Sequence, residues 1–185
     1  MRIVAGSRRG LTLEAPEGQT TRPTSDRARE ALFNILAGPK YLARLRDRPV
    51  ADFFAGSGAV GLEAVSRGAA ACTFLETDPA ALQVLRRNIS RLKDAAATCR
   101  VLARDASRPP KANEACGLLF FDPPYDADVA VTALLAAMDA GWLAEDGLAV
   151  IQVHPKRDVD APDGFEIADD RKYGATRFLF LERAQ

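Results

Sequence analysis

The sequence has few of the residues that build metal centres, disulfide frameworks or membrane spans. It contains three cysteines and one histidine among 185 residues. Because Cys72, Cys99 and Cys116 are widely spaced, we expect reduced thiols rather than a disulfide framework or a zinc site. No apolar run approaches the length of a membrane span, and the first residues lack the long apolar core of a signal peptide. These absences predict a cytoplasmic protein with no metal and no membrane partner.

The chain also lacks an excess of charge of either sign, since it has 25 basic and 25 acidic residues. The distribution is uneven, however. Residues 1–50 carry ten Lys or Arg and five Asp or Glu, whereas residues 51–185 carry fifteen and twenty. A basic N-terminal part beside an acidic body suits a polyanionic substrate that enters from one side. The plainer alternative is a solvated surface with an accidental asymmetry.

The length of the chain fits a single domain over residues 1–185, and its first 40 residues are expected to form a hairpin and a helix. Arg2–Ala5 and Leu11–Glu14 are predicted to be short strands joined by a glycine-containing turn. After a Pro- and Gly-rich loop, Thr24 or Ser25 is a candidate helix cap. The predicted apolar stripe of this helix consists of Ala28, Ala31, Leu32, Ile35 and Leu36. The polar row on its other face consists of Arg27, Glu30 and Asn34.

From Val50 onward, strand patterns alternate with helix patterns, which implies a mostly parallel, doubly wound α/β sheet. The last two strands, Phe165–Ala168 and Ala175–Leu181, are expected to pair antiparallel across the Tyr173-Gly174 turn. The other predicted strands are Val50–Phe54, Cys72–Glu76, Arg100–Ala103, Leu118–Phe121 and Leu148–Val153, and the helices lie near Ala59–Ser66, from Pro79 onward and at Val129–Met138.

The most informative stretch is a buried strand pattern that ends in Asp122-Pro123-Pro124-Tyr125. Proline has no N–H to donate, so strand pairing must end there. The motif falls at the carboxyl end of a strand, where open α/β sheets bind ligands. Asp122 and nearby carbonyl groups would accept hydrogen bonds from an exocyclic amino group, while Tyr125 would stack on the base. The alternative is a proline-rich turn in which the tyrosine merely packs.

A glycine-rich loop follows the first strand of this alternating part. Gly56, Gly58 and Gly61 match the G-x-G-x-x-G pattern of dinucleotide enzymes. Glu76 ends the next strand, where an acid that binds a ribose belongs. A nicotinamide-dependent dehydrogenase and an enzyme that uses S-adenosylmethionine both fit this pattern. A third possibility is that the glycines serve only tight helix–strand packing.

Two features favour the methyl donor over the nicotinamide cofactor. Asp52 lies just before the loop, where an acid could face a cationic amino group or a sulfonium. No hydride-transfer constellation is evident, and His154 is the only histidine. A further acid, Asp105, follows the third strand beside Ala106, where it could accept a hydrogen bond from an adenine amino group. The alternative for Asp105 is a solvated residue in a turn.

Taken in order, these motifs resemble those of class I S-adenosylmethionine-dependent methyltransferases. The chain is most similar to one family, the bacterial 16S rRNA (guanine(966)-N(2))-methyltransferases, and the resemblance runs nearly end to end. It is carried by Arg2–Gly6 with Arg9-Gly10, by Thr21–Asn34 and by Asp52–Ala64. The Asp-Pro-Pro-Tyr motif is shared with many amino-methylating enzymes, whereas Thr21–Asn34 makes the match specific.

This resemblance implies a Rossmann-like fold whose seven-stranded sheet has a reversed last strand, with S-adenosylmethionine as cofactor. It implies a substrate of 16S rRNA within a small ribosomal subunit or an assembly intermediate, with residues 1–40 facing the RNA, and we expect a monomer. The candidate catalytic residues are Asp122, Pro123, Pro124 and Tyr125. The candidate cofactor-binding residues are Asp52, Phe54, Ala55, Gly56, Ser57, Gly58, Glu76, Asp105 and Ala106. The candidate substrate-binding residues are Arg8, Arg9, Arg22, Thr24, Arg27, Arg29 and Asn34.

The sequence departs from the family pattern in two places. An acid is expected after the fifth strand, where this chain has Gln152-Val153-His154, and the tail beyond Gly164 matches mainly through Tyr173-Gly174. Three other functions stay open at this point. They are methylation of adenine N6 in DNA or RNA, NAD-dependent oxidoreduction, and RNA binding or assembly without catalysis.

Overall fold

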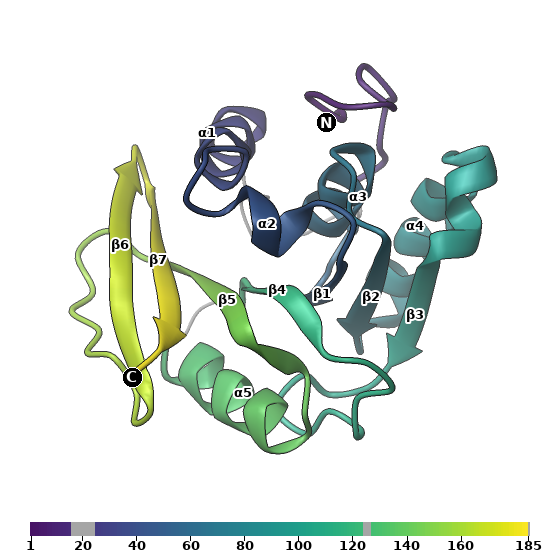
Figure 1. Cartoon of the computed structure of the whole chain (residues 1–185). Helices are drawn as coiled ribbons and strands as arrows, with labels where there is room; N and C mark the ends of the chain where they lie inside the picture. The colour runs from purple at the N-terminus through teal and green to yellow at the C-terminus, as the bar shows by residue number, and fades with distance from the viewer. Residues whose placement is uncertain (16–24, 124–126, 185) are drawn as a thin grey trace.

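The structure, a computed structural model, describes residues 1–15, 25–123 and 127–184. Within these residues, seven strands form one mixed sheet of order β3-β2-β1-β4-β5-β7-β6 (Figure 1). The strands are β1 (Pro49–Phe53), β2 (Ala71–Glu76), β3 (Cys99–Ala103), β4 (Cys116–Phe121), β5 (Leu143–Val153), β6 (Phe165–Tyr173) and β7 (Thr176–Arg183). The helices are α1 (Asp26–Leu36), α2 (Leu42–Leu45), α3 (Ala59–Ser66), α4 (Pro79–Ser90) and α5 (Ala127–Asp139), with the 3-10 helix η1 (Lys93–Thr98).

The last strand is reversed, as the resemblance implied. Strands β1 to β5 pair in parallel, whereas β7 lies between β5 and β6 and is antiparallel to both. The β6–β7 hairpin closes at Gly174, whose φ of 59° lies in the left-handed region that glycine adopts without strain. Strand β6 extends to Tyr173, beyond the predicted end at Ala168. The doubly wound fold with a reversed last strand is therefore confirmed.

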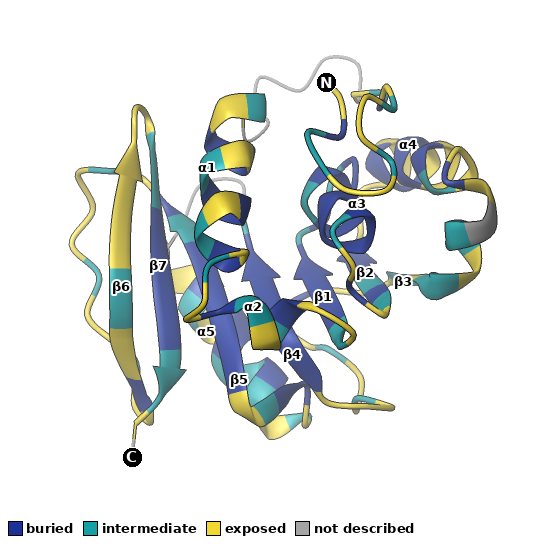
Figure 2. Ribbon diagram, turned by 45° about the horizontal axis from the view of Figure 1, so that its top comes forward, coloured by how far each residue is buried: buried dark blue, intermediate teal, exposed yellow. Residues whose placement is uncertain are grey.

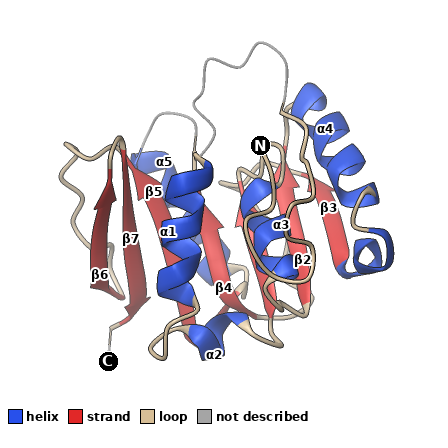
Figure 3. Ribbon diagram, turned by 90° about the horizontal axis from the view of Figure 1, so that it is seen from above, coloured by secondary structure: helices blue, strands red, loops and turns tan. Residues whose placement is uncertain are grey.

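Helices cover both faces of the sheet. Helices α1, α2 and α3 lie over one face and α5 over the other, as the view from above shows (Figure 3). The alternation of side chains in β4 follows these layers. Leu118 and Phe120 join the core beneath α1 to α4, whereas Leu119 and Phe121 join the core against α5. A strand buried on both faces reads as a continuous apolar run, because successive side chains point to opposite layers.

Burial differs sharply between the centre and one edge of the sheet. The central strands are buried almost throughout, whereas β6 is exposed along most of its length (Figure 2). None of the described helices combines the length and apolar composition needed to cross a membrane.

The N-terminal hairpin forms, but its two segments pair over fewer residues than predicted. Arg2 and Thr12 form an antiparallel bridge, flanked by hydrogen bonds from the Ile3 N–H to the Leu11 carbonyl and from the Leu13 N–H to the Met1 carbonyl, each at 2.9 Å. The backbone N–H groups of Val4 and Ala5 donate to the carboxylate of Glu63, at 2.7 and 3.0 Å. A side chain from α3 thus takes the donors of Val4 and Ala5, and the backbone pairing of the hairpin ends at Ile3, whose carbonyl accepts from the Gly10 N–H at 2.9 Å.

Helix α1 begins where the sequence indicated, but its buried face is rotated. Ser25 is the N-cap, and its hydroxyl accepts from the Ala28 N–H at 3.1 Å. Arg29 and Phe33 are buried, whereas the predicted stripe residues Ala31 and Ile35 are only half-buried. The Phe33 ring packs on Phe120 of β4, with ring centroids 5.8 Å apart, and this contact fixes the rotation of the helix.

Candidate active site

Three predicted acids meet at the carboxyl ends of the parallel strands. In the register of the parallel strands, Asp52 of β1 lies opposite Phe74 of β2 and Phe120 of β4. Glu76, the last residue of β2, and Asp122, the first residue after β4, therefore flank the carboxyl end of β1. Among the described residues no group of His, Cys, Asp and Glu could hold a metal ion, these acids included.

Asp52 anchors the helix that follows the glycine-rich loop. Its side chain is only 3% exposed, and its Oδ2 accepts from the Gly61 N–H at 2.9 Å. The N-cap of α3 is Gly58, which has no side chain to bind the free N–H groups of the first turn. Asp52 supplies that acceptor from the neighbouring strand. Sequence reasoning assigned Asp52 to the cofactor and did not find this role.

The environment of Asp52 disfavours its charged form. Burial raises the pKa of its carboxyl group to about 8, and the nearby negative charges of Asp122 and Glu76 act in the same direction. The hydrogen bond from Gly61 opposes the shift only in part. A cation bound among the three acids would favour ionisation of Asp52. The charges of Asp122 and Glu76 that disfavour ionisation of Asp52 would, for the same reason, attract a positively charged ligand.

The glycines of the loop divide into two kinds. A Cβ added to Gly58 would lie 2.4 Å from Leu85 Cδ1, and one added to Gly61 would lie 2.4 Å from Phe74 Cε1. These two glycines allow α3 to pack closely on its neighbours. Gly56 has a φ of 54°, and a Cβ there would meet no atom of the described residues within 4 Å. Gly56 thus borders open space, which leaves its backbone accessible to a ligand.

Glu76 is held rigidly beside this open backbone. Its Oε2 accepts from the Gly56 N–H at 2.7 Å, and its Oε1 accepts from the N–H groups of Thr77 and Asp78 at 2.7 and 2.9 Å. A carboxylate has about four acceptor positions, so acceptor capacity remains for ligand hydroxyl groups. Phe54, at the start of the loop, has a φ of 64°. Such conformations are uncommon for a bulky residue and are concentrated at functional sites.

Asp105, which follows β3, also lies at the carboxyl ends of the parallel strands. Asp105 Oδ1 accepts from both the N–H and the hydroxyl of Ser107, each at 2.8 Å, and these bonds hold the pKa of Asp105 below its usual value. Asp105 itself is exposed, whereas Ala106 is buried in the core against α5. The carboxylate of Asp105 is thus charged and fixed in direction.

The structure describes half of the Asp-Pro-Pro-Tyr motif. Strand β4 ends at Phe121, as predicted, and the half-buried Asp122 and buried Pro123 follow it. Pro124 and Tyr125 lie outside the described residues, so the stacking role of Tyr125 stays a prediction.

The candidate substrate residues differ in how far they are exposed to solvent. Arg9, Arg27 and Asn34 are exposed, and Arg8 is half-buried. Arg22 and Thr24 lie outside the described part of the chain.

Arg29 must be removed from the predicted substrate set. Its side chain is fully buried, and its Nη2 lies 2.9 Å from Asp26 Oδ1. The same nitrogen donates to the carbonyl of Arg2, and Nε lies 3.7 Å from Glu63 Oε2. Arg29 occupies the rotated, buried face of α1, so it serves the fold and offers no surface to a substrate.

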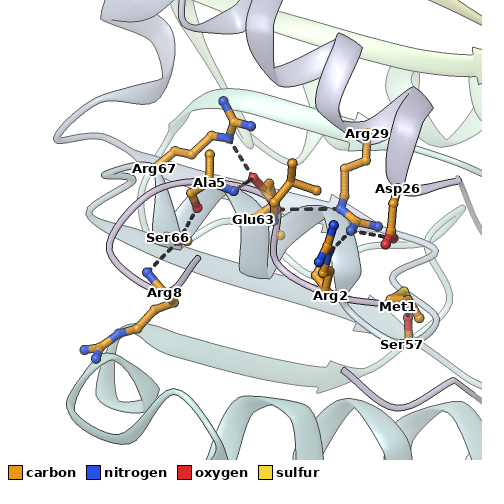
Figure 4. A network of polar contacts seen from close by, with 12 residues as sticks. Met1, Arg2, Ala5, Arg8, Asp26, Arg29, Ser57, Glu63, Ser66 and Arg67 are labelled. Atoms are coloured by element: carbon orange, nitrogen blue, oxygen red, sulfur yellow. Dashed lines mark hydrogen bonds and ion pairs between the residues drawn. The ribbon is translucent and has the colours of Figure 1, made fainter. Parts of the chain in front are cut away.

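Helix α3 holds the N-terminal segment through two polar residues that sequence reasoning missed (Figure 4). Glu63 is fully buried and accepts from the Nε of Arg67 at 2.7 Å, besides the N–H groups of Val4 and Ala5. Ser66 donates to the Ala5 carbonyl at 2.6 Å and accepts from the Arg8 N–H at 3.0 Å. A glutamate within an apolar helix was the available signal in the sequence.

Asn88 connects the same segment to the glycine-rich loop. This fully buried residue of α4 donates to the Ser57 carbonyl at 2.9 Å and to the Glu14 carbonyl at 3.1 Å. Its Oδ1 accepts from the Glu14 N–H at 2.8 Å. His154, in contrast, is exposed, and its Nδ1 accepts from the Lys156 N–H at 3.2 Å within a turn.

Comparison with known proteins identifies the family of this chain. The family model described as "Conserved hypothetical protein 95" matches residues 1–182. "Ribosomal RNA small subunit methyltransferase D" of Escherichia coli (strain K12) is 39% identical over 153 residues, which are 82% of this chain and 74% of the relative. The protein of the same name from Haemophilus influenzae is 29% identical over 98% of this chain and 93% of the relative.

Solved structures give the same result. The yhhF protein of Escherichia coli matches with a TM-score of 0.84 at 34% sequence identity, over 99% of this chain and 97% of that one. The resemblance found in the sequence is therefore confirmed, and the chain belongs to the ribosomal RNA small subunit methyltransferase D family of class I methyltransferases.

Proposed function

We propose that this protein transfers a methyl group from S-adenosylmethionine to the exocyclic N2 of a guanine in 16S rRNA. By family resemblance the target is position 966 in the usual rRNA numbering. We further propose that it acts as a cytoplasmic monomer on a small ribosomal subunit or an assembly intermediate. The observation that carries this proposal is the meeting of Asp52, Glu76 and Asp122 around the open backbone of Gly56. The two relatives named as small-subunit rRNA methyltransferases support it.

The described residues suit this cofactor in charge and in shape. Bound S-adenosylmethionine supplies an electrophilic methyl group carried on a sulfonium. Glu76 forms no ion pair with any described Lys or Arg, and a cation bound beside Asp52 would favour the ionised form of that carboxyl group, so a cationic ligand would meet negative charge that the described residues do not neutralise. The Glu76 carboxylate would bind the ribose hydroxyl groups, and the open side of Gly56 would admit the adenosine. Asp105 would accept from the adenine amino group.

Asp122 would orient the target amino group. The exocyclic nitrogen of guanine is a poor nucleophile, because its lone pair is delocalised into the ring. Acceptors at Asp122 and the adjacent carbonyl would fix the N–H bonds and help to localise that lone pair toward the methyl group. Positioning of this kind can supply roughly 7–11 kcal/mol of a reaction barrier. The proton that leaves would pass to Asp122 or to water.

The remaining contacts to the base and the RNA come from two segments. Tyr125 would stack on the extruded base, a contact worth about 1–3 kcal/mol. Arg8, Arg9 and Arg27, with Arg22, Thr24 and Asn34, would contact the RNA backbone. Since Ser66 and Glu63 fix the turn that carries Arg8 and Arg9, these cations are presented by a rigid support.

Methyl transfer to isolated substrates tests this proposal. The protein is incubated with labelled S-adenosylmethionine and either small subunits from cells that lack it, free 16S rRNA or DNA. We expect label in the rRNA of the subunits, and we expect S-adenosylmethionine, not NAD, to raise the melting temperature. Stabilisation by NAD alone would favour the oxidoreductase, and subunit binding without label would favour a non-catalytic RNA-binding module.

A further inference from the structure

A second concentration of positive charge lies outside the basic N-terminal part. Residues 86–111 contain eight Lys or Arg and two Asp or Glu, a balance of +6. The rest of residues 51–185 contains seven basic and eighteen acidic residues. Residues 51–185 are acidic in total, yet they contain a basic segment whose balance of +6 exceeds the +5 of residues 1–50.

The fold gathers this segment at one edge of the sheet. Strand β3 is the edge strand, and α4 and η1 pack beside it (Figure 1). All eight side chains are exposed. We call this surface the β3 edge, and it comprises Arg86, Arg87, Arg91, Lys93, Arg100, Arg104, Arg108 and Lys111.

Most of this charge is not neutralised by the protein. Arg87 lies 2.7 Å from Glu14, and Arg91 pairs with the same carboxylate. The other six cations form no ion pair with any acid in the described part of the chain. Unpaired cations that lie close together repel one another, and a bound polyanion would relieve this repulsion. Their concentration on the β3 edge therefore favours binding of a polyanion.

Protection of an edge strand does not explain the pattern. Charged side chains on an exposed edge prevent pairing with another sheet, and this would account for Arg100 on β3. It does not account for cations on α4, on η1 and in the loop before β4. The opposite edge strand, β6, is protected by charges of both signs, including Asp170 and Lys172.

The β3 edge is continuous with the basic N-terminal segment and with the active site. Glu14 joins that segment to Arg87 and Arg91, and Arg91 Nη1 donates to the Thr12 carbonyl at 3.0 Å. At its other end, Arg104 immediately precedes Asp105, the candidate acid for the adenine amino group. The cations of the β3 edge thus begin beside residues 12–14 and extend to the residue before Asp105.

We infer that the β3 edge binds backbone phosphates of the rRNA substrate at a distance from the target guanine. This inference rests on the proposed function and extends its RNA footprint beyond residues 1–40. Exposed Lys and Arg that bind phosphates release counterions, so each contact contributes about −0.9 to the slope of log affinity against log salt for a duplex and about −0.7 for a single strand.

A pair of matched double variants tests the inference. Arg86→Gln with Arg100→Gln removes two cations of the β3 edge from two different elements, and both side chains are exposed. Arg171→Gln with Lys172→Gln removes two exposed cations from β6 and changes the net charge equally. Binding to small subunits is measured across a salt series without cofactor, and KM, kcat and the Kd for S-adenosylmethionine are measured separately.

We expect the β3-edge variant to bind subunits roughly tenfold more weakly, with a salt slope shallower by about one to two units. Its kcat and its Kd for S-adenosylmethionine should match those of the wild type, and the β6 variant should match throughout. An unchanged slope in the β3-edge variant, or an equal loss in both variants, would overturn the inference. If the wild type binds subunits but transfers no methyl group, the proposed function fails while the binding series still decides the footprint. A wild type that does not bind subunits would overturn both.

Discussion

The Glu63 carboxylate lies 3.7 Å from the Arg29 Nε atom, and neither side chain is exposed. This buried pair joins α3 to α1, while the same carboxylate binds the backbone of Val4 and Ala5. At its other end, α3 is anchored to β1 through Asp52. One short helix therefore links the N-terminal basic segment to the glycine-rich loop, so the segment proposed to face RNA and the loop proposed to bind the cofactor share a single support.

Removing Glu63 should destabilise the protein strongly. Glu63→Ala leaves the buried Arg29 with the partly exposed Asp26 as its remaining acidic partner, and breaking a buried pair typically costs about 3–5 kcal/mol. Urea denaturation monitored by circular dichroism measures the free energy of unfolding. The double variant Arg29→Met with Glu63→Leu should lose less, since no buried charge of that pair is left. A loss below about 1 kcal/mol in Glu63→Ala would contradict the role of the pair.

Alanine substitution should have different effects at the two kinds of glycine, reducing mainly stability at Gly61 and mainly cofactor affinity at Gly56. Gly61→Ala forces a Cβ to within 2.4 Å of Phe74 and should reduce stability by about 1–3 kcal/mol. The Cβ that Gly56→Ala adds meets no atom within 4 Å in the part of the chain that the structure describes, and its left-handed φ costs about 1–2 kcal/mol. We expect Gly56→Ala to stay folded yet lose affinity for S-adenosylmethionine in calorimetric titration. Wild-type affinity in that variant would exclude close approach of the cofactor to Gly56.

Asp52 should make stability depend on pH. Burial raises its pKa to about 8 in the folded protein, against about 3.9 for an unfolded aspartate. Between these values the folded state holds a proton that the unfolded state lacks, so stability falls as pH rises through this window. Asp52→Asn removes this dependence. The free energy of unfolding of the variant, relative to that of the wild type, should therefore increase from pH 5 to pH 8 in denaturant titrations. If the two proteins instead gave parallel curves of unfolding free energy against pH, Asp52 would be ionised throughout this range.

Asp122 should separate catalysis from cofactor binding. Asp122→Ala removes the acceptor for the target amino group but leaves Glu76 and the loop glycines in place. We expect turnover to be abolished while the Kd for S-adenosylmethionine changes little. Equal loss of turnover and cofactor affinity would instead assign Asp122 to the cofactor site.

The strands, and the carboxyl ends of the parallel strands β1 to β5, could be predicted because local patterns determine them. The apolar run of β4 and the prolines after Asp122 fix where that strand stops, and parallel pairing then brings Asp52 and Glu76 to the same edge. The glycine pattern likewise identified the loop, although it could not separate Gly56 from Gly61. That distinction depends on which atoms lie across from each Cβ position.

The polar contacts inside the fold could not be predicted, because their partners are distant in sequence. Arg29 reads as one more exposed cation until Glu63 is known to face it. The N-terminal strands have hairpin character, yet the carboxylate of Glu63 takes the donors of Val4 and Ala5. Asn88 lies within the apolar stripe of α4, and only the fold shows that it binds Ser57.

The most direct test of the central claim is nucleoside analysis of methylated rRNA. Small subunits from cells that lack the protein are treated with the wild type or with Asp122→Ala in the presence of labelled S-adenosylmethionine, and the 16S rRNA is digested to nucleosides. The account predicts label in N2-methylguanosine with the wild type and none with the variant. Label in N6-methyladenosine, or no label with a wild type that binds the cofactor, would contradict it.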